Sequence, residues 1–173
     1  MNRSKPFPVI IEPYSFKWPL QFEEEKARLL QVISPYTICI EHIGSTAVPG
    51  LPAKPVIDIL IGVRRLEDAC RFLPPLELLG YRYISELEKE IPERRYLQKL
   101  TANAHTHHLH IAEPDSQFFI DHLRFRDLLR AHPDLAEKYA KLKYELAKRY
   151  RYDREAYTDA KSDFIEKALL FPS

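Results

Sequence analysis

The chain has 173 residues, of which 45% are hydrophobic and 29% are charged, and its formal net charge at pH 7 is +1. These values predict one globular domain spanning residues 1–173, and they exclude a fibrous or disordered chain. Because the net charge is small, no general basic field attracts nucleic acid, and we do not expect a nucleic-acid partner. No apolar run approaches the roughly 20 residues that span a bilayer, and the N-terminus lacks the apolar stretch of a signal peptide. We therefore expect a cytoplasmic protein with no membrane partner.

Residues 1–18 are rich in proline and are predicted to be extended. Hydrophobic periodicity and turn residues then predict, in chain order, a helix over 21–33, strands over 36–43 and 56–63, a helix over 65–79, strands over 81–84, 94–99 and 107–112, and helices over 116–131, 134–150 and 155–170. This order favours an α+β fold with a mixed central sheet of about five strands, helices mainly on one face, and a helical C-terminal tail over 116–170.

The local sequence pattern predicts whether several polar side chains and thiols are buried or exposed to solvent. Glu23, Glu24 and Glu25 are predicted to lie on the solvated face of the first helix. Cys39 lies in an apolar run and Cys70 in an expected helix, and neither belongs to a Cys-x-x-Cys motif, so both are predicted to be buried thiols.

The segment from 124 to 154 is strongly basic, with ten Lys or Arg residues against five acids and a net charge of +5. We interpret it as the solvated faces of ordinary helices. The alternative is a basic wall that faces a polyanionic ligand.

The loop and strand from 44 to 60 carry the residues with the clearest chemical meaning. Gly44 lets backbone amides approach an anion closely, and the hydroxyls of Ser45 and Thr46 add further donors. In the strand that follows, Ile57, Ile59 and Ile61 share one face, whereas Asp58 shares the other with Val56 and Leu60. A carboxylate in so apolar a strand needs a hydrogen-bonding partner or a metal, so we expect Asp58 to open onto a cleft.

Four of the seven histidines lie between residues 105 and 110. His108 and His110 alternate with Leu109 and Ile111, so the two imidazoles are predicted to share one face of a strand. They could contact a metal ion or a phosphate, or they could form a simple hydrogen-bonded pair.

The runs 42–51 and 54–59, together with 106–110, 125–130 and 157–165, resemble the GrpB family, which is similar in fold to the DNA polymerase β type of nucleotidyltransferases. The resemblance covers roughly residues 8–170. It implies that Gly44 and Ser45 bind phosphates and that Asp58 is the first metal-binding acid, while Leu60 occupies the second acid position. His108 and His110 would then stand where the third acid is expected. One carboxylate with two imidazoles suits Zn²⁺ or Mn²⁺ better than Mg²⁺.

Together these features predict a protein that binds a phosphorylated small molecule, either a nucleotide or a coenzyme, at the Gly44–Ser45 turn. Asp58, His108 and His110 would bind a divalent metal or act as acid–base groups in nucleotidyl or phosphoryl transfer. The expected phosphate-binding residues are Gly44, Ser45, Thr46, Lys54, Arg124, Arg126 and Lys161. The alternative is a catalytically degenerate member that serves as a ligand sensor or interaction module, and the sequence sets no oligomeric state.

Overall fold

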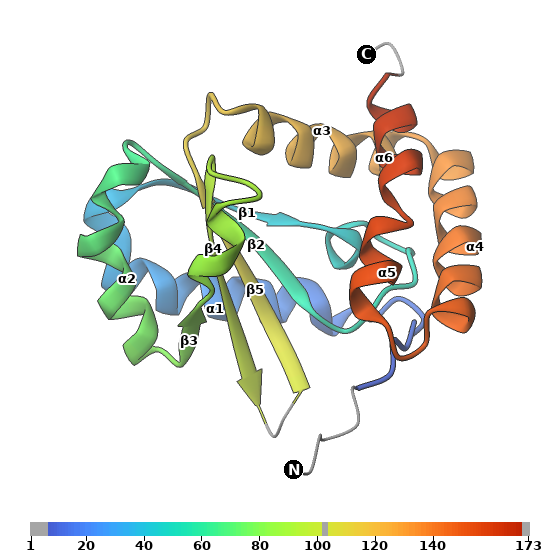
Figure 1. The fold of residues 1–173 in the computed structure, drawn as a ribbon, viewed down its shortest axis with the longest axis horizontal. Coiled ribbons are helices and arrows are strands. Elements are labelled where there is room, and N and C mark those ends of the chain that lie inside the picture. Colours follow the sequence, from blue (N-terminus) through green and yellow to red (C-terminus); the bar gives the residue numbers. More distant parts are fainter. Residues whose placement is uncertain (1–6, 102–103, 171–173) are drawn as a thin grey trace.

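A computed structural model describes residues 7–101 and 104–170 of the chain. The elements follow in the order α1 (Lys17–Ile33), β1 (Thr37–Ile43), β2 (Ile57–Val63), α2 (Ala69–Leu78), β3 (Tyr81–Tyr83), β4 (Arg94–Thr101), β5 (Ala104–Ala112), α3 (Gln117–Ala131), α4 (Pro133–Arg149), α5 (Arg154–Asp159) and α6 (Ser162–Leu169) (Figure 1). Among the helices of these described ranges, none is both long enough and apolar enough to span a membrane.

The five strands form one mixed sheet in the order β1-β2-β5-β4-β3. β2 and β5 run parallel, and the other neighbouring pairs are antiparallel. The predicted α+β fold with a mixed five-stranded sheet is therefore confirmed. The parallel register places Asp58 directly opposite His108 on β5, and the antiparallel register places Asp58 opposite Ile43 on β1.

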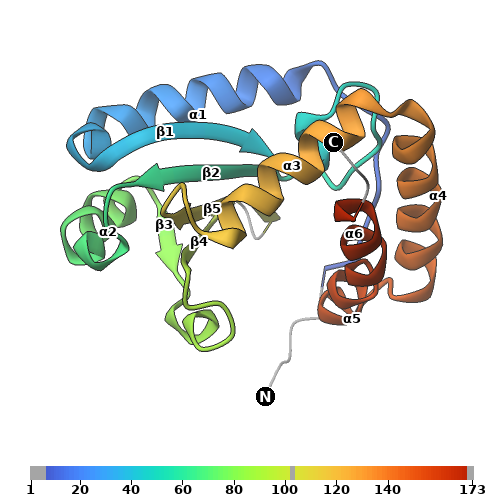
Figure 2. The same ribbon diagram turned by 90° about the horizontal axis from the view of Figure 1, so that it is seen from above.

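The two faces of the sheet are covered differently, as Figure 2 shows. α1 and α2 pack on the face that carries Ile57, Ile59 and Ile61, and these side chains belong to the largest buried cluster. α3 packs through Phe119 against Leu60 on the opposite face. The remaining helices, α4, α5 and α6, stand beside the sheet (Figure 2). The alternation of β2 thus separates a closed face from the partly open face on which Asp58 lies.

The C-terminal tail differs from the prediction, because the single helix expected over 155–170 is two helices, α5 and α6. The two helices are separated at Ala160 and Lys161, and their buried side chains belong to different clusters. Tyr157 of α5 packs with Val9 and residues of α4, whereas Ala168 of α6 joins the cluster around Val48 and Tyr139.

The first helix also differs from the prediction, since α1 begins at Lys17 and buries a carboxylate. Glu25 is fully buried rather than solvated. Its Oε1 accepts hydrogen bonds from Tyr81 Oη and Lys99 Nζ, both at 2.9 Å, and its Oε2 accepts one from Arg28 at 3.0 Å. Burial is tolerated because charged and polar donors from β3, β4 and α1 satisfy the carboxylate.

The two cysteines differ in burial. Cys39 is half-buried, but Cys70 is exposed, so the prediction that Cys70 is buried is wrong.

Helix α2 contains two adjacent prolines. It continues through Pro74 and Pro75 to Leu78, and it is held to the core by Phe72 and Leu76 on its inner side.

Candidate functional site

The turn after β1 is shaped around the Asp58 carboxylate. Gly44 has φ +71°, and a Cβ placed there would lie 2.5 Å from Asp58 Oδ2. Glycine is therefore required both by the positive φ and by the close approach of the aspartate side chain. The sequence predicted that Gly44 makes room for a bound anion. In the structure, the group that closely approaches Gly44 is the Asp58 carboxylate of the protein.

The close approach predicts a measurable difference between two glycine substitutions. Gly50 has φ +79°, but a Cβ there would meet nothing within 4 Å. We expect Gly50→Ala to cost about 1 kcal/mol of unfolding free energy from backbone strain alone. Gly44→Ala should cost about 2–4 kcal/mol, because displacement of Asp58 adds to that strain. Urea unfolding measures both values, and equal losses would show that Asp58 does not require the glycine.

Asp58 begins a chain of hydrogen-bonded side chains. Its Oδ1 lies 3.0 Å from His108 Nδ1, and His108 Nε2 lies 3.2 Å from His105 Nδ1. A carboxylate only accepts, so His108 donates from Nδ1, and a donation from His105 Nδ1 to His108 Nε2 completes the chain. Burial opposes ionisation of Asp58, but the hydrogen bond from His108 and the neighbouring positive charges outweigh it and lower its pKa to about 2. Burial and the charge of Arg154 lower the pKa of His105 to about 4.

His110 does not join this series of hydrogen bonds. Its Nδ1 lies 3.1 Å from Arg94 Nη1, and since a guanidinium only donates, that nitrogen is already an acceptor. The ring packs beside Phe118 and His122 of α3, and burial together with the charge of His122 lowers its pKa well below the usual value. Over residues 7–101 and 104–170, no group of three or more His, Cys, Asp or Glu residues could hold a metal ion. Asp58, His108 and His110 share a face, but the donor set for a three-ligand site is not assembled.

The two hydroxyls of the turn have protein partners. Thr46 is 1% exposed, and its Oγ1 donates to the Val56 carbonyl at 3.3 Å. That hydroxyl has one proton, so at the 3.0 Å contact with His42 Nε2 it is the acceptor. Thr46 thus ties the turn to the start of β2 and is too buried to meet a phosphate. Ser45 is half-buried and hydrogen-bonds to Tyr139 of α4.

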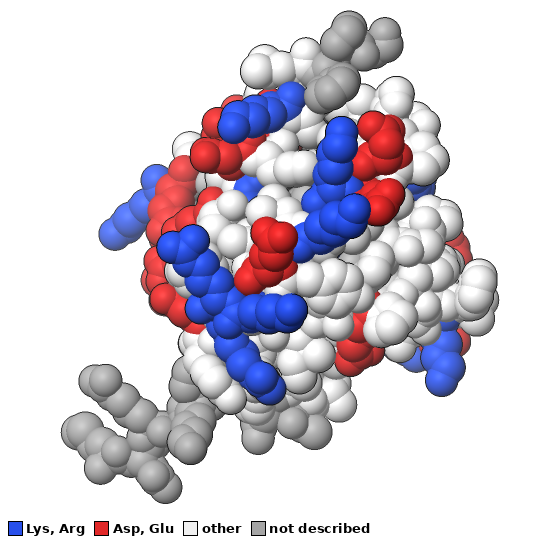
Figure 3. All heavy atoms as spheres, turned by 90° about the vertical axis from the view of Figure 1, so that its right-hand side faces the viewer, with Lys and Arg blue, Asp and Glu red and all other residues white. Residues whose placement is uncertain are grey.

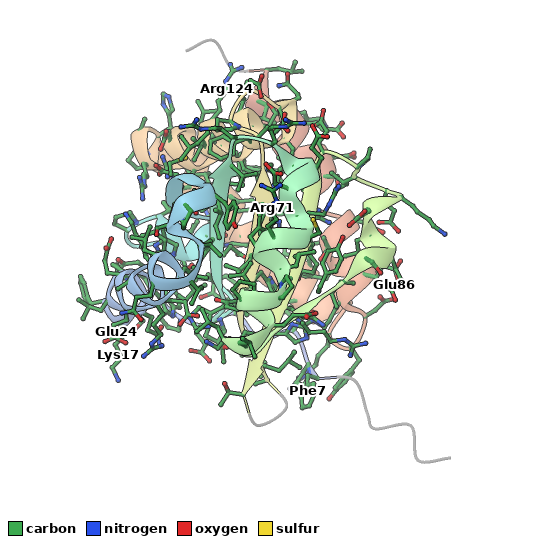
Figure 4. The ribbon with its side chains drawn as sticks, turned by 90° about the vertical axis from the view of Figure 1, so that its left-hand side faces the viewer. Phe7, Lys17, Glu24, Arg71, Glu86 and Arg124 are labelled. Carbon is green, nitrogen blue, oxygen red and sulfur yellow. The ribbon has the colours of Figure 1, made fainter. Side chains whose placement is uncertain are left out.

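The two arginines expected to bind phosphate lie on α3 and have other surroundings. The Arg126 guanidinium contacts Glu41 Oε2 and Asp127 Oδ1, each at 2.8 Å, so its charge is already balanced. Figure 4 shows Arg124 at the end of the molecule opposite Phe7. Phe7 lies near Lys54 and Arg154, two cations that line a cleft between the sheet and α5. Neither arginine lines that cleft.

The predicted lysines lie together, and the tail adds further cations. Lys54 Nζ and Lys161 Nζ lie 5.1 Å and 4.5 Å from the centre of the Tyr157 ring. Lys143, which is 2% exposed, donates to the Pro52 carbonyl. Burial and repulsion from Lys161 and Lys54 lower the pKa of Lys143 to about 7, and burial and repulsion from Lys54 lower that of Lys161 to about 8. Burial and the charge of Arg154 lower the pKa of Lys54.

A cleft of about 400 Å³ opens between the sheet and α5, and we call it the basic cleft. It is lined by Lys54, Ile84, Leu87, Tyr96, Gln98, His105, His108, Arg154 and Thr158. The sequence interpretation missed His105, Lys143 and Arg154. The signals for them were the cluster of histidines and the net charge of +5 between residues 124 and 154.

The cations of the basic segment lie in two different surroundings. On the outer side of α4, Lys138 pairs with Asp134 at 3.8 Å and Lys141 with Glu137 at 2.8 Å, and all four side chains are largely exposed. Figure 3 shows this side of the molecule, where Lys and Arg side chains lie among Asp and Glu. Lys143 and Arg154 instead face inward, toward Pro52 and the basic cleft.

The GrpB protein family matches residues 8–170 of the chain. The chain belongs to the GrpB family. It is similar to the crystal structure of conserved protein GrpB from Enterococcus faecalis, with 39% identity, a TM-score of 0.84, and coverage of 92% of this chain and 94% of that one. It is 43% identical to the protein YqkA of Bacillus subtilis over 90% of this chain, which spans 44% of the length of YqkA. A weaker similarity is to terminal uridylyl transferase 4 from Trypanosoma brucei with bound CTP, with 12% identity, coverage of 82% of this chain and 42% of that one, and a TM-score of 0.47.

Proposed function

We propose that the basic cleft binds a phosphorylated small molecule, a nucleotide or a coenzyme, through its phosphate groups. The observation that carries this proposal is an excess of positive charge. Lys54 and Arg154 line the cleft, Lys161 lies with Lys54 beside the Tyr157 ring, and Lys143 is close enough to both lysines to be repelled by them. In the described parts of the chain, none of these four residues forms an ion pair with a carboxylate. Asp58 contributes one negative charge and is itself hydrogen-bonded to His108.

The crowding of the lysines favours an anionic ligand. Burial disfavours the charged forms of Lys54, Lys143 and Lys161, and so does repulsion from neighbouring cations, which for Lys54 is Arg154. A phosphate group would offset this repulsion. The ammonium groups act as point charges toward phosphate oxygens. The cleft volume of about 400 Å³ falls within the roughly 300–1,000 Å³ typical of small-molecule pockets.

Between the two functions expected from the sequence, the donor set favours ligand binding over metal-dependent transfer. Leu60, at the second acid position, is fully buried and cannot bind a metal, and His110 is engaged by Arg94. Without these two metal ligands, the hydrogen-bonded side chains Asp58, His108 and His105 are available for acid–base chemistry on a bound phosphate compound. We therefore propose a ligand-binding or ligand-sensing role as the principal function.

A thermal-shift experiment with ADP and inorganic pyrophosphate tests the proposal. At a ligand concentration of 100 times Kd, the wild-type protein should gain about 2.7 kcal/mol of stability. Lys54→Met and Lys161→Met should each weaken binding by about tenfold or more, since Lys54 lines the cleft and Lys161 adds its charge beside it at the Tyr157 ring. The matched control is Lys138→Met, because that side chain is exposed on the outer side of α4. Equal loss in the control, or no stabilisation of the wild type, would contradict a phosphate site in the basic cleft.

A further inference from the structure

A second hollow of about 230 Å³ adjoins the basic cleft, and we call it the N-terminal hollow. The two spaces share Lys54, His105 and Arg154 in their linings. The rest of the N-terminal hollow differs in character, because it is lined mainly by apolar side chains and prolines, namely Phe7, Pro8, Val9, Ile10, Pro55 and Val56, with Glu12 and Ala104 completing it. Three charged or polar residues thus stand where a polar space meets an apolar one.

The wall of the N-terminal hollow is held in place by backbone pairing. The Val9 amide donates to the Arg151 carbonyl at 2.7 Å, which fixes the segment to the connection between α4 and α5. Glu12 and Ala53 exchange two backbone hydrogen bonds at 2.9 and 3.0 Å, which fix it to the loop before β2. Val9 is buried against Tyr157, so the segment has a fixed position next to the lysine cluster.

The apolar side chains of this wall keep large exposed surfaces. Phe7 is 50% exposed and Ile10 is 51% exposed, although Val9 between them is buried. Exposed apolar surface around a concave space gains free energy when an apolar group covers it. Since the cations lie at the junction with the basic cleft, a molecule that fills both spaces must carry its charge at the junction and its apolar part next to Phe7 and Ile10.

We infer that the N-terminal hollow holds an apolar or aromatic arm of the ligand whose phosphate groups lie at Lys54 and Arg154. The ligand class is therefore an organic phosphate with an apolar arm, and inorganic phosphate or polyphosphate is excluded as the physiological ligand. This inference rests on the proposed function, because it assigns the phosphates to the basic cleft.

Calorimetric titration with paired probes tests the inference. ADP is compared with inorganic pyrophosphate, and octyl phosphate with inorganic phosphate, so each pair differs by an aromatic or an aliphatic arm. We expect at least one armed probe to bind the wild type about tenfold or more tightly than its inorganic partner. Phe7→Ala and Ile10→Ser should remove that advantage while leaving the affinity for the inorganic partner unchanged. Ile120→Ser is the control, because Ile120 is similarly exposed, at 45%, but lies on α3 outside the hollow.

The outcomes separate this inference from the proposed function. Equal affinity within both pairs, or an advantage that survives in both hollow variants, would overturn the apolar arm while leaving phosphate binding intact. Failure of all four probes to bind the wild type would overturn the proposed function and the inference together. The aromatic and aliphatic arms of the experiment distinguish a nucleobase from an alkyl chain.

Discussion

Replacing Lys143 by methionine is expected to stabilise the ligand-free protein at pH 7 by about 2 kcal/mol. The side chain is 2% exposed, and burial with repulsion from Lys161 and Lys54 lowers its pKa to about 7. Burying a charge costs several kcal/mol, so removing the charge stabilises the folded protein. Loss of the hydrogen bond to Pro52 offsets about 1 kcal/mol of this stabilisation. Methionine keeps the length and apolar stem of the side chain without the charge.

The pH dependence of this effect has a definite sign. The folded-state pKa of Lys143 lies below its unfolded value of 10.5, so the unfolded chain binds more protons between about pH 7 and pH 10.5. The free energy of unfolding of the wild type should therefore rise with pH across that window, and it should rise less in Lys143→Met. Urea unfolding at pH 7 and pH 9.5 measures both slopes, with the exposed Lys141→Met as control. Identical slopes in the wild type and Lys143→Met would show that this lysine is not destabilised by burial.

Glu25→Gln is expected to destabilise the protein by about 3 kcal/mol. The carboxylate is fully buried and accepts hydrogen bonds from Tyr81 and Lys99, and burial opposes its ionisation while these donors lower its pKa. Removal of the charge leaves the Lys99 ammonium without its partner, and breaking a buried pair typically costs about 3–5 kcal/mol. The lower end applies because Lys99 keeps 20% of its side-chain surface exposed.

A neighbouring glutamate on the same helix provides the control for this effect. Glu24 is exposed, and Glu24→Gln should change the unfolding free energy by no more than about 0.5 kcal/mol. The double variant Glu25→Gln/Lys99→Met should recover part of the lost stability, since it also removes the Lys99 ammonium, which has no carboxylate partner in the single variant. Indistinguishable stabilities of Glu25→Gln and Glu24→Gln would mean that the buried network contributes nothing.

Features set by local chemistry were predictable from the sequence. The alternation of β2 placed Ile57, Ile59 and Ile61 in the core and Asp58 on the other face, because successive side chains of a strand point to opposite faces. The requirement for glycine at position 44 was also readable, although its cause is the approach of Asp58. Asp58 and His108, which were assigned to one site, do lie side by side, because β2 and β5 pair in a parallel register.

Features that depend on the direction of one side chain, or on distant parts of the chain, were not predictable. His110 shares a face with His108 but bonds to Arg94, whose position depends on the register of β4. Glu25 looked solvated because its partners Tyr81 and Lys99 lie more than fifty residues away in sequence. The same holds for Lys143, since the helical spacing of α4 does not reveal which face turns toward Pro52.

A crystal structure of the protein grown with ADP would test the central claim most directly. We expect the phosphate oxygens to lie within about 2.7–3.2 Å of Lys54 Nζ and the Arg154 guanidinium, which both line the cleft. The adenine ring should then lie against Phe7 and Ile10. Phosphate groups bound instead beside Lys138 and Lys141, on the outer side of α4, would contradict a ligand site in the basic cleft.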